Sequence, residues 1–508
     1  MPKRCHWWVA GALGAVPLLA APAPSPAQDW AALAAARLPL LSPCQVAGVE
    51  ETLLCGTIEV WEDRAAERGR RIGLKVVVVP AESERPPADP VVVLAGGPGA
   101  AATARAAPSV RSQGLRKRDI LLVDQRGTGG SNPLDCDLPT SARPGELAEL
   151  YPREAVARCA ADLARRADLG QYGTAAFADD LEEVRRRLGY GPLNLQGGSY
   201  GTRAMMVFAQ RHPESTRTLF GIGIDSPLHS NLAERGTSAQ QALEELSRRC
   251  AAEPSCRALV PDLAASAARL LAKVEAEPAR VAVTAAGPDG KALSLVLSRP
   301  WLSEQLRTLL YYTDTARALP WAFHRAEAAG DWLPLARLAL GIEQWFRSTL
   351  AEGLALSVQC SELLGLDLEQ ARHRGRETVF GNERLEQQLQ GCAAWPHRPA
   401  PLLGVETPRP LSIPALLLSG ALDPVTRPAY GEDARTLFPK SRHVMVSEAH
   451  HGLFELEGAW GCVHRVWADF VERGSVEGLD ASCLEALPGP PFAVNPERFE
   501  AYFVEAFE

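Results

Sequence analysis

The sequence lacks an excess of positive charge, any Cys-x-x-Cys pair, any internal repeat and, beyond its first residues, any apolar run long enough to cross a bilayer. Its 53 Lys and Arg residues face 61 Asp and Glu residues, and the resulting formal net charge of −8 excludes a nucleic-acid binder that works by bulk charge. Without a Cys-x-x-Cys pair, a zinc ribbon or a redox dithiol has no support. We therefore expect a protein with no nucleic-acid partner and no membrane span, soluble in its mature form.

The overall composition is that of a globular protein. Of the 508 residues, 46% are hydrophobic and 22% are charged, which is far from the polar, highly charged profile of a disordered chain. A sizeable buried core is expected. The length suggests two or three domains, or one large α/β domain that carries an insertion.

The beginning of the chain has the three-part layout of a secretory signal peptide. Lys3 and Arg4 precede an apolar run over 7–23, and small residues follow up to Ala27. A membrane anchor is the alternative, but the run is shorter than the ~20 residues that a spanning helix needs and contains Pro17. We predict a signal peptide at 1–27 and a periplasmic or secreted protein.

Cysteine usage agrees with export. Cys5 lies in the predicted signal peptide, and the ten cysteines that remain are an even number, as a fully oxidised protein requires. The sequence does not determine their connectivity. Pairing of neighbours would give Cys44–Cys55, Cys136–Cys159, Cys250–Cys256, Cys360–Cys392 and Cys462–Cys483.

Short apolar runs that alternate with helical patterns predict a mostly parallel, doubly wound sheet. The clearest helical pattern lies at 175–188. The alternation stops after Asp225 and resumes near Ile413, so we predict an α/β core made of 28–225 and 413–508, with a helical cap domain over 226–412. The predicted strands are 75–79, 91–95, 120–123, 193–196, 219–224, 415–418 and 443–446.

The predicted cap holds an uneven share of the large aromatic residues. Most are expected to form the core of the cap itself, and some to line a pocket that faces the sheet, because ligand sites favour domain interfaces. They include Trp301, Tyr311, Tyr312, Trp321, Trp332, Trp345 and Phe346.

A candidate nucleophile follows the predicted strand at 193–196. Residues 197–201 read Gly-Gly-Ser-Tyr-Gly, which is a Gly-x-Ser-x-Gly turn between a strand and an apolar helix. Such a turn is strained at its central residue and brings strand and helix close together, so glycine is favoured at its flanks. This context predicts that Ser199 presents its hydroxyl above the sheet.

A serine nucleophile needs a histidine base and a carboxylate that orients it, and the chain supplies both after the serine. Asp423 follows the strand 415–418, and a histidine pair, His450 and His451, follows the strand 443–446. We prefer His451 as the base. Asp225 is a competing acid and Glu448 a weaker one.

An oxyanion hole is the third requirement. We expect its donors to be the backbone N–H of Tyr200 and the N–H of Gly97, in the loop after the strand 91–95, since Pro98 has no N–H. The same loop offers a competing interpretation as a Rossmann dinucleotide site, with Asp124 as the ribose-binding acid. Pro98 within it, the export signal and the Ser/Asp/His set argue against that reading.

Four motifs, taken together and in order, make the chain resemble exported α/β-hydrolases of the prolyl aminopeptidase and tripeptidyl aminopeptidase family, over most of the mature length. Residues 400–485 are similar to the carboxy-terminal segment of such proteins. The motifs are Gly-Gly-Pro-Gly at 96–99, Asp-Gln-Arg-Gly-Thr-Gly at 124–129, Gly-Gly-Ser-Tyr-Gly-Thr at 197–202 and Leu-Ser-Gly-x-x-Asp-Pro-Val-Thr at 418–426.

The resemblance implies an eight-stranded α/β-hydrolase sheet, a helical cap and an exopeptidase activity on free amino termini. Acidic cap residues bind the substrate ammonium in prolyl members, and Glu362, two residues after Cys360, is our candidate for that role. Ala95, Ala100 and Tyr200 depart from the prolyl pattern and favour the tripeptidyl side. Arg126 is expected to brace the loop beside the active site.

We therefore predict a serine aminopeptidase that releases proline or a short peptide from peptides with a free amino terminus. Ser199, Asp423 and His451 form the predicted triad, and no metal or organic cofactor is required. We expect a monomer. A cap-gated carboxylesterase or lipase is the alternative, because the same triad cleaves esters. A binding protein on an inactive hydrolase fold is disfavoured, because no member of the triad is lost.

Overall fold

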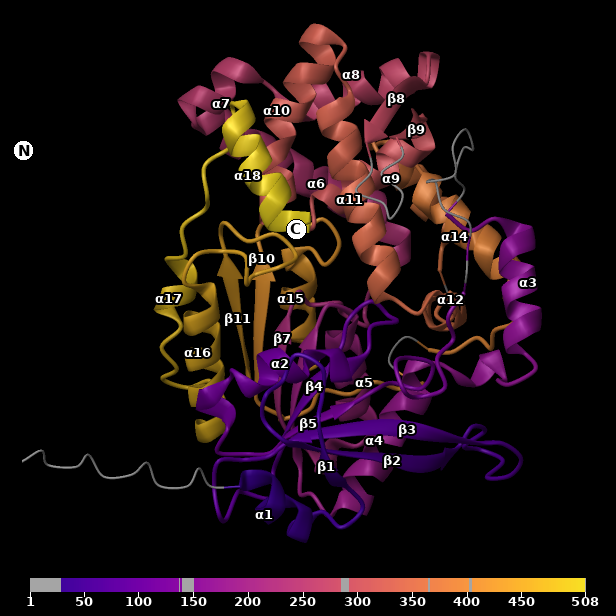
Figure 1. Cartoon of the computed structure of the whole chain (residues 1–508), viewed down its shortest axis with the longest axis vertical. Helices are drawn as coiled ribbons and strands as arrows, with labels where there is room; N and C mark the ends of the chain where they lie inside the picture. The colour runs from indigo at the N-terminus through magenta and orange to yellow at the C-terminus, as the bar shows by residue number, and fades with distance from the viewer. Residues whose placement is uncertain are drawn as a thin grey trace, which may run out of the picture.

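A computed structural model describes residues 29–136, 138, 150–284, 292–363, 366–401 and 404–507. The predicted signal peptide at 1–27 lies outside these residues. Figure 1 shows a sheet-containing lower part and a helical upper part, with the chain passing from the lower to the upper part and back.

The central element is a nine-stranded sheet in the order β1-β2-β3-β5-β4-β6-β7-β10-β11. From β5 to β11 all neighbours pair in parallel, whereas β1, β2 and β3 pair with antiparallel neighbours. The strands are β1 (Ser42–Cys44), β2 (Leu53–Trp61), β3 (Arg71–Val79), β4 (Val91–Leu94), β5 (Ile120–Val123), β6 (Leu193–Gly198), β7 (Thr216–Ile222), β10 (Ala415–Gly420) and β11 (Ser441–Val446).

The predicted mostly parallel sheet is confirmed, and each predicted run overlaps an observed strand. The expected count of eight is one too low, since the three-residue edge strand β1 adds a ninth. Strand β2 was not predicted because it is not a continuous apolar run. Cys55, Gly56, Thr57 and Glu59 interrupt it, and Thr57 and Glu59 are exposed.

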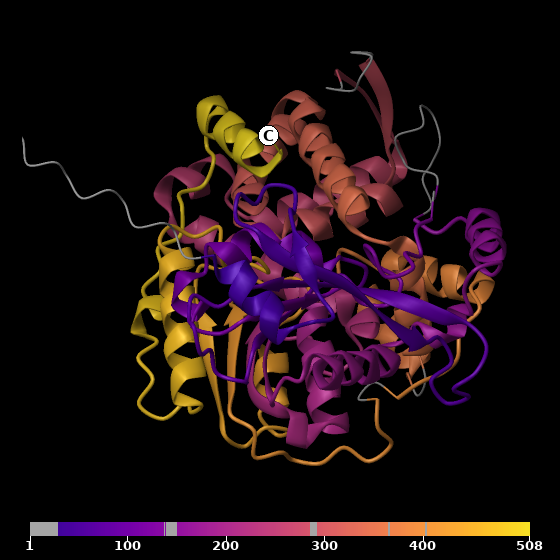
Figure 2. The same ribbon diagram turned by 60° about the horizontal axis from the view of Figure 1, so that its bottom comes forward.

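Helices cover both faces of the sheet, so the lower part has three layers (Figures 1 and 2). Alternate residues of one strand face opposite layers. In β5, Leu121 and Val123 pack in the cluster that includes helices α4 and α5, and Ile120 and Leu122 in the cluster that includes α16. The helices outside the stretch between β7 and β10 are α1 (Trp30–Arg37), α2 (Ala106–Val110), α3 (Arg153–Leu163), α4 (Thr174–Leu188), α5 (Tyr200–Arg211), α15 (Pro428–Ala434), α16 (Ala459–Arg473), α17 (Ser482–Glu485) and α18 (Pro496–Phe507).

The upper part consists of the segments between β7 and β10, where the sequence predicts a helical cap. It also contains a hairpin of β8 (Ala279–Thr284) and β9 (Ala292–Leu297), which the sequence analysis does not predict. The terminal helix α18 packs against α10 and α11 of this upper part. The helices are α6 (Asn231–Ala252), α7 (Pro254–Leu259), α8 (Leu263–Ala276), α9 (Arg299–Leu309), α10 (Thr313–Ala329), α11 (Leu333–Thr349), α12 (Glu352–Ser361), α13 (Leu368–Arg376) and α14 (Glu383–Ala394).

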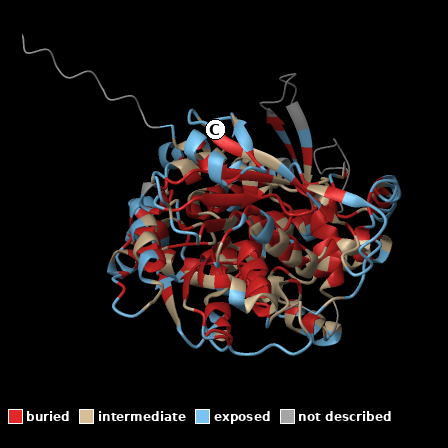
Figure 3. Cartoon of the chain, turned by 90° about the horizontal axis from the view of Figure 1, so that it is seen from below, coloured by how far each residue is buried: buried red, intermediate tan, exposed pale blue. Residues whose placement is uncertain are grey.

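Upper and lower parts have separate apolar cores, and one cap helix belongs to the lower core. The central strands β4, β5, β7 and β10 and the helix segments that face them are mainly buried (Figure 3). Leu354, Leu356 and Val358 of α12 pack in the same cluster as strands β3, β4 and β6, whereas α6, α8, α9, α10 and α11 share a cluster of their own. Helix α12 is therefore anchored to the sheet side.

Five disulfides connect the ten cysteines that follow the predicted signal peptide, and the neighbour pairing is confirmed. The pairs are Cys44–Cys55, Cys136–Cys159, Cys250–Cys256, Cys360–Cys392 and Cys462–Cys483. Such a set is typical of proteins from oxidising compartments. Within the described ranges, no helix combines the length and apolarity that a membrane crossing requires.

Candidate active site

Ser199 lies at the junction of β6 and α5, in a sharp strand-to-helix turn. Its φ of 55° and ψ of −128° are unusual for a residue with a side chain, as the motif predicts. The turn also demands close packing: a Cβ on Gly201 would lie 2.4 Å from the carbonyl oxygen of Leu94. Only glycine lets the start of α5 approach the end of β4 this closely.

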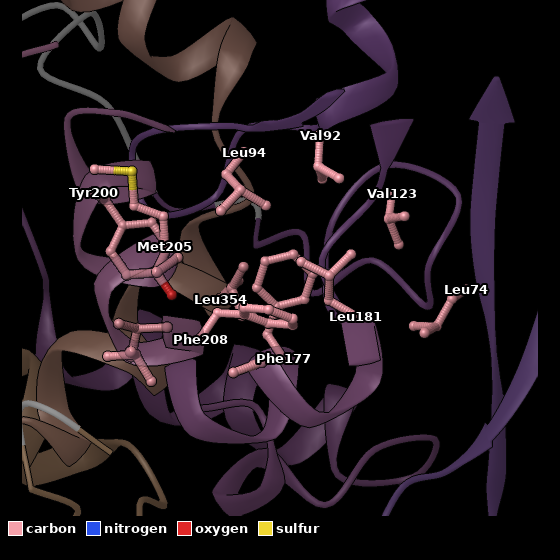
Figure 4. Close-up of a cluster of buried hydrophobic side chains, with 14 of the residues drawn as sticks. Leu74, Val92, Leu94, Val123, Phe177, Leu181, Tyr200, Met205, Phe208 and Leu354 are labelled. Carbon is pink, nitrogen blue, oxygen red and sulfur yellow. The ribbon is translucent and has the colours of Figure 1, made fainter. Parts of the chain in front are cut away.

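An apolar cluster supports this turn from below (Figure 4). Tyr200, Met205 and Phe208 of α5 pack with Leu94 of β4 and with Leu354 of cap helix α12. The Tyr200 hydroxyl lies 2.9 Å from the Thr174 hydroxyl. The helix that follows Ser199 is therefore fixed against both the sheet and one cap helix.

Asp423 is buried in the loop after β10, where it is surrounded by donors. Its carboxylate accepts hydrogen bonds from the backbone N–H groups of Val425 and Thr426, each at 2.8 Å, and from the Thr426 hydroxyl at 2.6 Å. The His451 Nδ1 atom lies 2.7 Å from its Oδ2. Burial alone would raise the pKa of Asp423, but His451 and these hydrogen bonds hold the pKa below its usual value.

His451 follows β11 and is held from three sides. Its backbone N–H donates to the Tyr311 carbonyl at 3.0 Å, the two rings meet edge to face at 5.1 Å, and a Cβ on Gly223 would lie 3.1 Å from the imidazole. With Asp423 accepting a hydrogen bond from Nδ1–H, the neutral imidazole carries its free lone pair on Nε2. That is the tautomer that a general base requires.

The competing residues have other partners. His450 is fully buried, its Nδ1 lies 2.8 Å from the Leu310 carbonyl, and burial lowers its pKa to about 3. Asp225 accepts from Arg203, and Glu448 pairs with Arg317 at 2.7 Å. Of the predicted acids, the structure brings Asp423 to a histidine.

The loop after β4 passes directly over the nucleophile turn. A Cβ on Gly96 would lie 3.2 Å from the Ser199 Cβ, and Gly97 lines the same cavity as Ser199. Tyr200 is the first residue of α5, and the first N–H groups of a helix have no partner within it. The structure therefore brings both predicted oxyanion donors, Gly97 and Tyr200, to the cavity wall.

Glu362 ends helix α12 and lies in a charged network that sequence reasoning did not find. Its carboxylate accepts from Arg203 at 2.6 Å and from the Thr174 hydroxyl at 2.9 Å, and Arg203 also donates to Asp225 at 2.9 Å. Burial raises the pKa of Glu362, nearby Asp225 adds to this effect and Arg203 opposes it. Arg203 was detectable, because it is the one charged residue in the apolar stretch 200–209.

A cavity of about 720 Å³ lies between the sheet and the cap, within the size range of small-molecule and peptide sites. Ser199, Tyr200, Gly97, His451 and Glu362 line it, and Asp423 lies behind His451. Of the predicted cap aromatics, Trp301 and Trp332 are buried in the cap core. Tyr311, Tyr312, Trp345 and Phe346 line the cavity.

The residues of the competing dinucleotide interpretation have structural contacts. The Asp124 carboxylate accepts from the backbone and hydroxyl of Thr103 and from the N–H of Gly130, so its oxygens are used within the core. Arg126 donates twice to Asp180 at 2.7 Å and also to backbone carbonyls. This bracing matches the structural role predicted for it.

In the described ranges, no group of three or more His, Cys, Asp or Glu side chains is arranged to hold a metal ion. The nucleophile turn at the carboxyl end of β6, the acid after β10 and the histidine after β11 occur in the order that defines α/β-hydrolases. The protein has the α/β-hydrolase fold.

Comparison with known proteins agrees with this class and confirms the predicted resemblance. Residues 89–251 match the family model described as "alpha/beta hydrolase fold", and residues 377–483 match "TAP-like protein". Proline iminopeptidase of Neisseria gonorrhoeae is 31% identical over 28% of this chain and 35% of its own length. Serine protease Hip1 of Mycobacterium tuberculosis is 28% identical over 40% of this chain and 42% of its own length.

These sequence matches are partial, since the chain spans about a third to two fifths of the length of these curated relatives. Among solved structures, proline iminopeptidase of Mycobacterium smegmatis is similar, with 16% identity, 82% of this chain and 98% of that chain covered, and a TM-score of 0.39. That likeness is too weak to bear on function.

Proposed function

We propose that this protein is a periplasmic or secreted serine aminopeptidase that releases proline or a short peptide from free amino termini. One observation carries the proposal. A serine in a strained turn, a histidine paired at 2.7 Å with a buried aspartate, and a partly buried glutamate all belong to one cavity. The peptidase names of the sequence relatives support the same reading.

In the proposed reaction, His451 Nε2 takes the proton of the Ser199 hydroxyl while the oxygen attacks the scissile carbonyl carbon. The N–H groups of Gly97 and Tyr200 stabilise the negative charge on the carbonyl oxygen. His451 then returns the proton to the leaving amine, and an acyl-enzyme remains on Ser199. Water, activated by His451, releases the amino-terminal fragment.

Glu362 supplies the selectivity for a free amino terminus in this proposal. It lies at the end of a helix that packs into the sheet core, and its hydroxyl partner Thr174 also contacts Tyr200, which follows the nucleophile. A carboxylate in this position is fixed relative to Ser199. Arg203 compensates one of the two carboxylates beside it, Asp225 and Glu362, so one negative charge remains for an ammonium group.

Export is supported by the five disulfides and by the signal-peptide pattern at 1–27. Proteolysis of peptides outside the cytoplasm fits both. Fractionation of cells that produce the full chain would test this part. We expect to find the protein in the periplasm or the medium, without its first 27 residues. Retention of an intact chain in the cytoplasm would contradict this part of the proposal.

A carboxylesterase is the second candidate, because one part of the cavity is apolar. Phe220, Trp467 and Leu453 line it, and the Phe220 and Trp467 rings stack at 5.0 Å. Such a wall suits an acyl chain. The triad chemistry would be unchanged, and the carboxylates around Arg203 would then have no substrate group to bind.

Matched substrates separate the two candidates. We would compare chromogenic prolyl, alanyl and tripeptidyl amides, their N-acetylated twins and a short-chain ester. Cleavage of the free amines but not of the acetylated twins is expected, and the preferred length would define the subclass. Turnover of the ester alone, or equal rates with and without acetylation, would overturn the aminopeptidase assignment.

A further inference from the structure

The cap side of the cavity carries an unbalanced group of arginines. Arg235 of α6, Arg307 of α9 and Arg384 of α14 all line it, and Glu304 is the acid between them. Arg307 donates to both oxygens of Glu304, at 2.9 and 2.6 Å, and is the arginine most directly paired with this carboxylate. Arg384 approaches Glu304 no closer than 3.6 Å.

Arg235 has no hydrogen bond and no ion pair to any residue that the structure describes. Its Nε is buried without a hydrogen-bond partner, as are Nε and Nη1 of Arg384. Even with Glu352, which lies 3.4 Å from the nearby Tyr151 hydroxyl, three guanidinium groups face two carboxylates. Burial and the proximity of Arg384 lower the pKa of Arg235 to about 10. Such a side chain is costly to bury unless an anion joins it.

Tyr311 connects this group of arginines to His451, the proposed base. The Tyr311 ring lies against the His451 ring at 5.1 Å, and the Tyr311 hydroxyl accepts a hydrogen bond from Arg307 at 2.9 Å. An anion bound to Arg235 and Arg384 would therefore lie in the same cavity as Ser199 and His451.

The two walls of the cavity carry charge clusters of opposite sign. On the sheet side, Asp225 and Glu362 flank the single Arg203, and on the cap side Arg235, Arg307 and Arg384 lie around Glu304. A peptide whose ammonium group lies at the first wall and whose acyl carbon lies at Ser199 has its first side chains inside the cavity. One of these side chains can meet the second wall.

We propose that Arg235 and Arg384 form an anion subsite that binds a carboxylate side chain, Asp or Glu, within the amino-terminal fragment that the enzyme releases. This inference rests on the proposed aminopeptidase function and adds a substrate preference to it. Open guanidinium N–H groups bind a carboxylate through paired, charge-assisted hydrogen bonds, which a neutral amide side chain does not reproduce.

The test uses free-amino peptide amides that differ only by Glu or Gln at the first, second or third position. At one position the wild type is expected to favour Glu in kcat/KM by about 10- to 100-fold, in line with hydrogen bonds to charged groups. Arg235→Gln and Arg384→Gln should reduce that ratio towards 1, and Arg235→Lys should retain part of it. A Glu placed after the scissile bond should give no comparable preference.

Arg269→Gln is the matched control, since Arg269 lies on the outer surface of α8, paired with Glu327, and should leave the ratio intact. Equal kcat/KM for Glu and Gln at every position, with free-amino substrates still cleaved, would overturn the subsite and leave the aminopeptidase standing. A preference that survives both Gln variants would also overturn it. Failure to cleave any free-amino amide would overturn the proposed function, and the subsite with it.

Discussion

The two walls of the active-site cavity are built in different ways. On the sheet side, Ser199, Asp423 and His451 follow strand ends, and short loops and backbone hydrogen bonds fix them. On the cap side, long charged side chains project from separate helices and retain unpaired nitrogen atoms, as at Arg235 and Arg384. The sheet-side wall is thus suited to carrying out one reaction, and the charged cap-side wall is suited to selecting substrates.

The largest expected effect comes from breaking the sheet-side wall. Ser199→Ala or His451→Ala should lower kcat by at least about 10³-fold, since triad members act as a unit. His450→Asn is the matched control on the same loop, because Asn can still donate to the Leu310 carbonyl. The His450→Asn substitution should change the melting temperature of the protein more than its kcat. Full activity of Ser199→Ala in steady-state assays would contradict the assignment of the triad.

A smaller and more selective effect is expected at Glu362, the carboxylate beside Arg203 on the sheet-side wall. Glu362→Gln keeps an acceptor for Thr174 but loses the charge, so KM for free-amino substrates should rise by about 10- to 100-fold. The rate on N-acetylated twins should stay as it is. An equal change in KM for free and acetylated substrates would mean that Glu362 does not bind the amino terminus.

Removal of a disulfide tests whether the discrimination between free and acetylated substrates depends on the position of Glu362. Cys360–Cys392 ties α12 to α14, and its removal by a double Ala substitution should destabilise the protein by about 3 kcal/mol. It should also weaken the discrimination between free and acetylated substrates. Cys250–Cys256, which closes a loop in the cap, is the matched control and should affect thermal stability alone. Loss of discrimination in both double variants would contradict the assignment.

The smallest effect concerns pH and Glu455, close to the base. Burial raises the pKa of Glu455 to about 8, so this group binds a proton in the folded state that the unfolded chain gives up above about pH 4.5. Its contribution to stability is full below about pH 4.5 and is lost as pH rises through about 8. Glu455→Gln should remove about 2 kcal/mol of this dependence in denaturant titrations at pH 6.5 and 9. An unchanged pH profile would show that Glu455 is ionised.

Much of the sheet-side wall is predictable from the sequence because its signals are local. The turn around Ser199 and the acid and histidine after later strands each occupy a few consecutive residues, and chain order joins them. The sequence alone leaves the choice between His450 and His451 open, since adjacent loop residues differ only in the direction in which their side chains point. The structure separates them, because one is fully buried against Leu310 and the other is paired with Asp423.

The cap-side wall is not predictable in this way. Arg235, Arg307 and Arg384 come from helices far apart in the chain, and nothing in their local sequence distinguishes them from surface arginines. Helix packing brings these three arginines together at one cavity. The sequence does not predict strand β2 for a different reason: its polar and partly exposed residues interrupt the continuous apolar run that marks the other strands.

The central claim is that Ser199 forms a covalent bond to a substrate whose free amino terminus the cavity recognises. The most direct test uses a peptidyl phosphonate with a free amino terminus and its N-acetylated twin, followed by mass spectrometry of the digested protein. We predict an adduct on the peptide that contains Ser199, formed at least about 10-fold faster by the free amine. An adduct on another residue, or equal rates for the two reagents, would contradict the account.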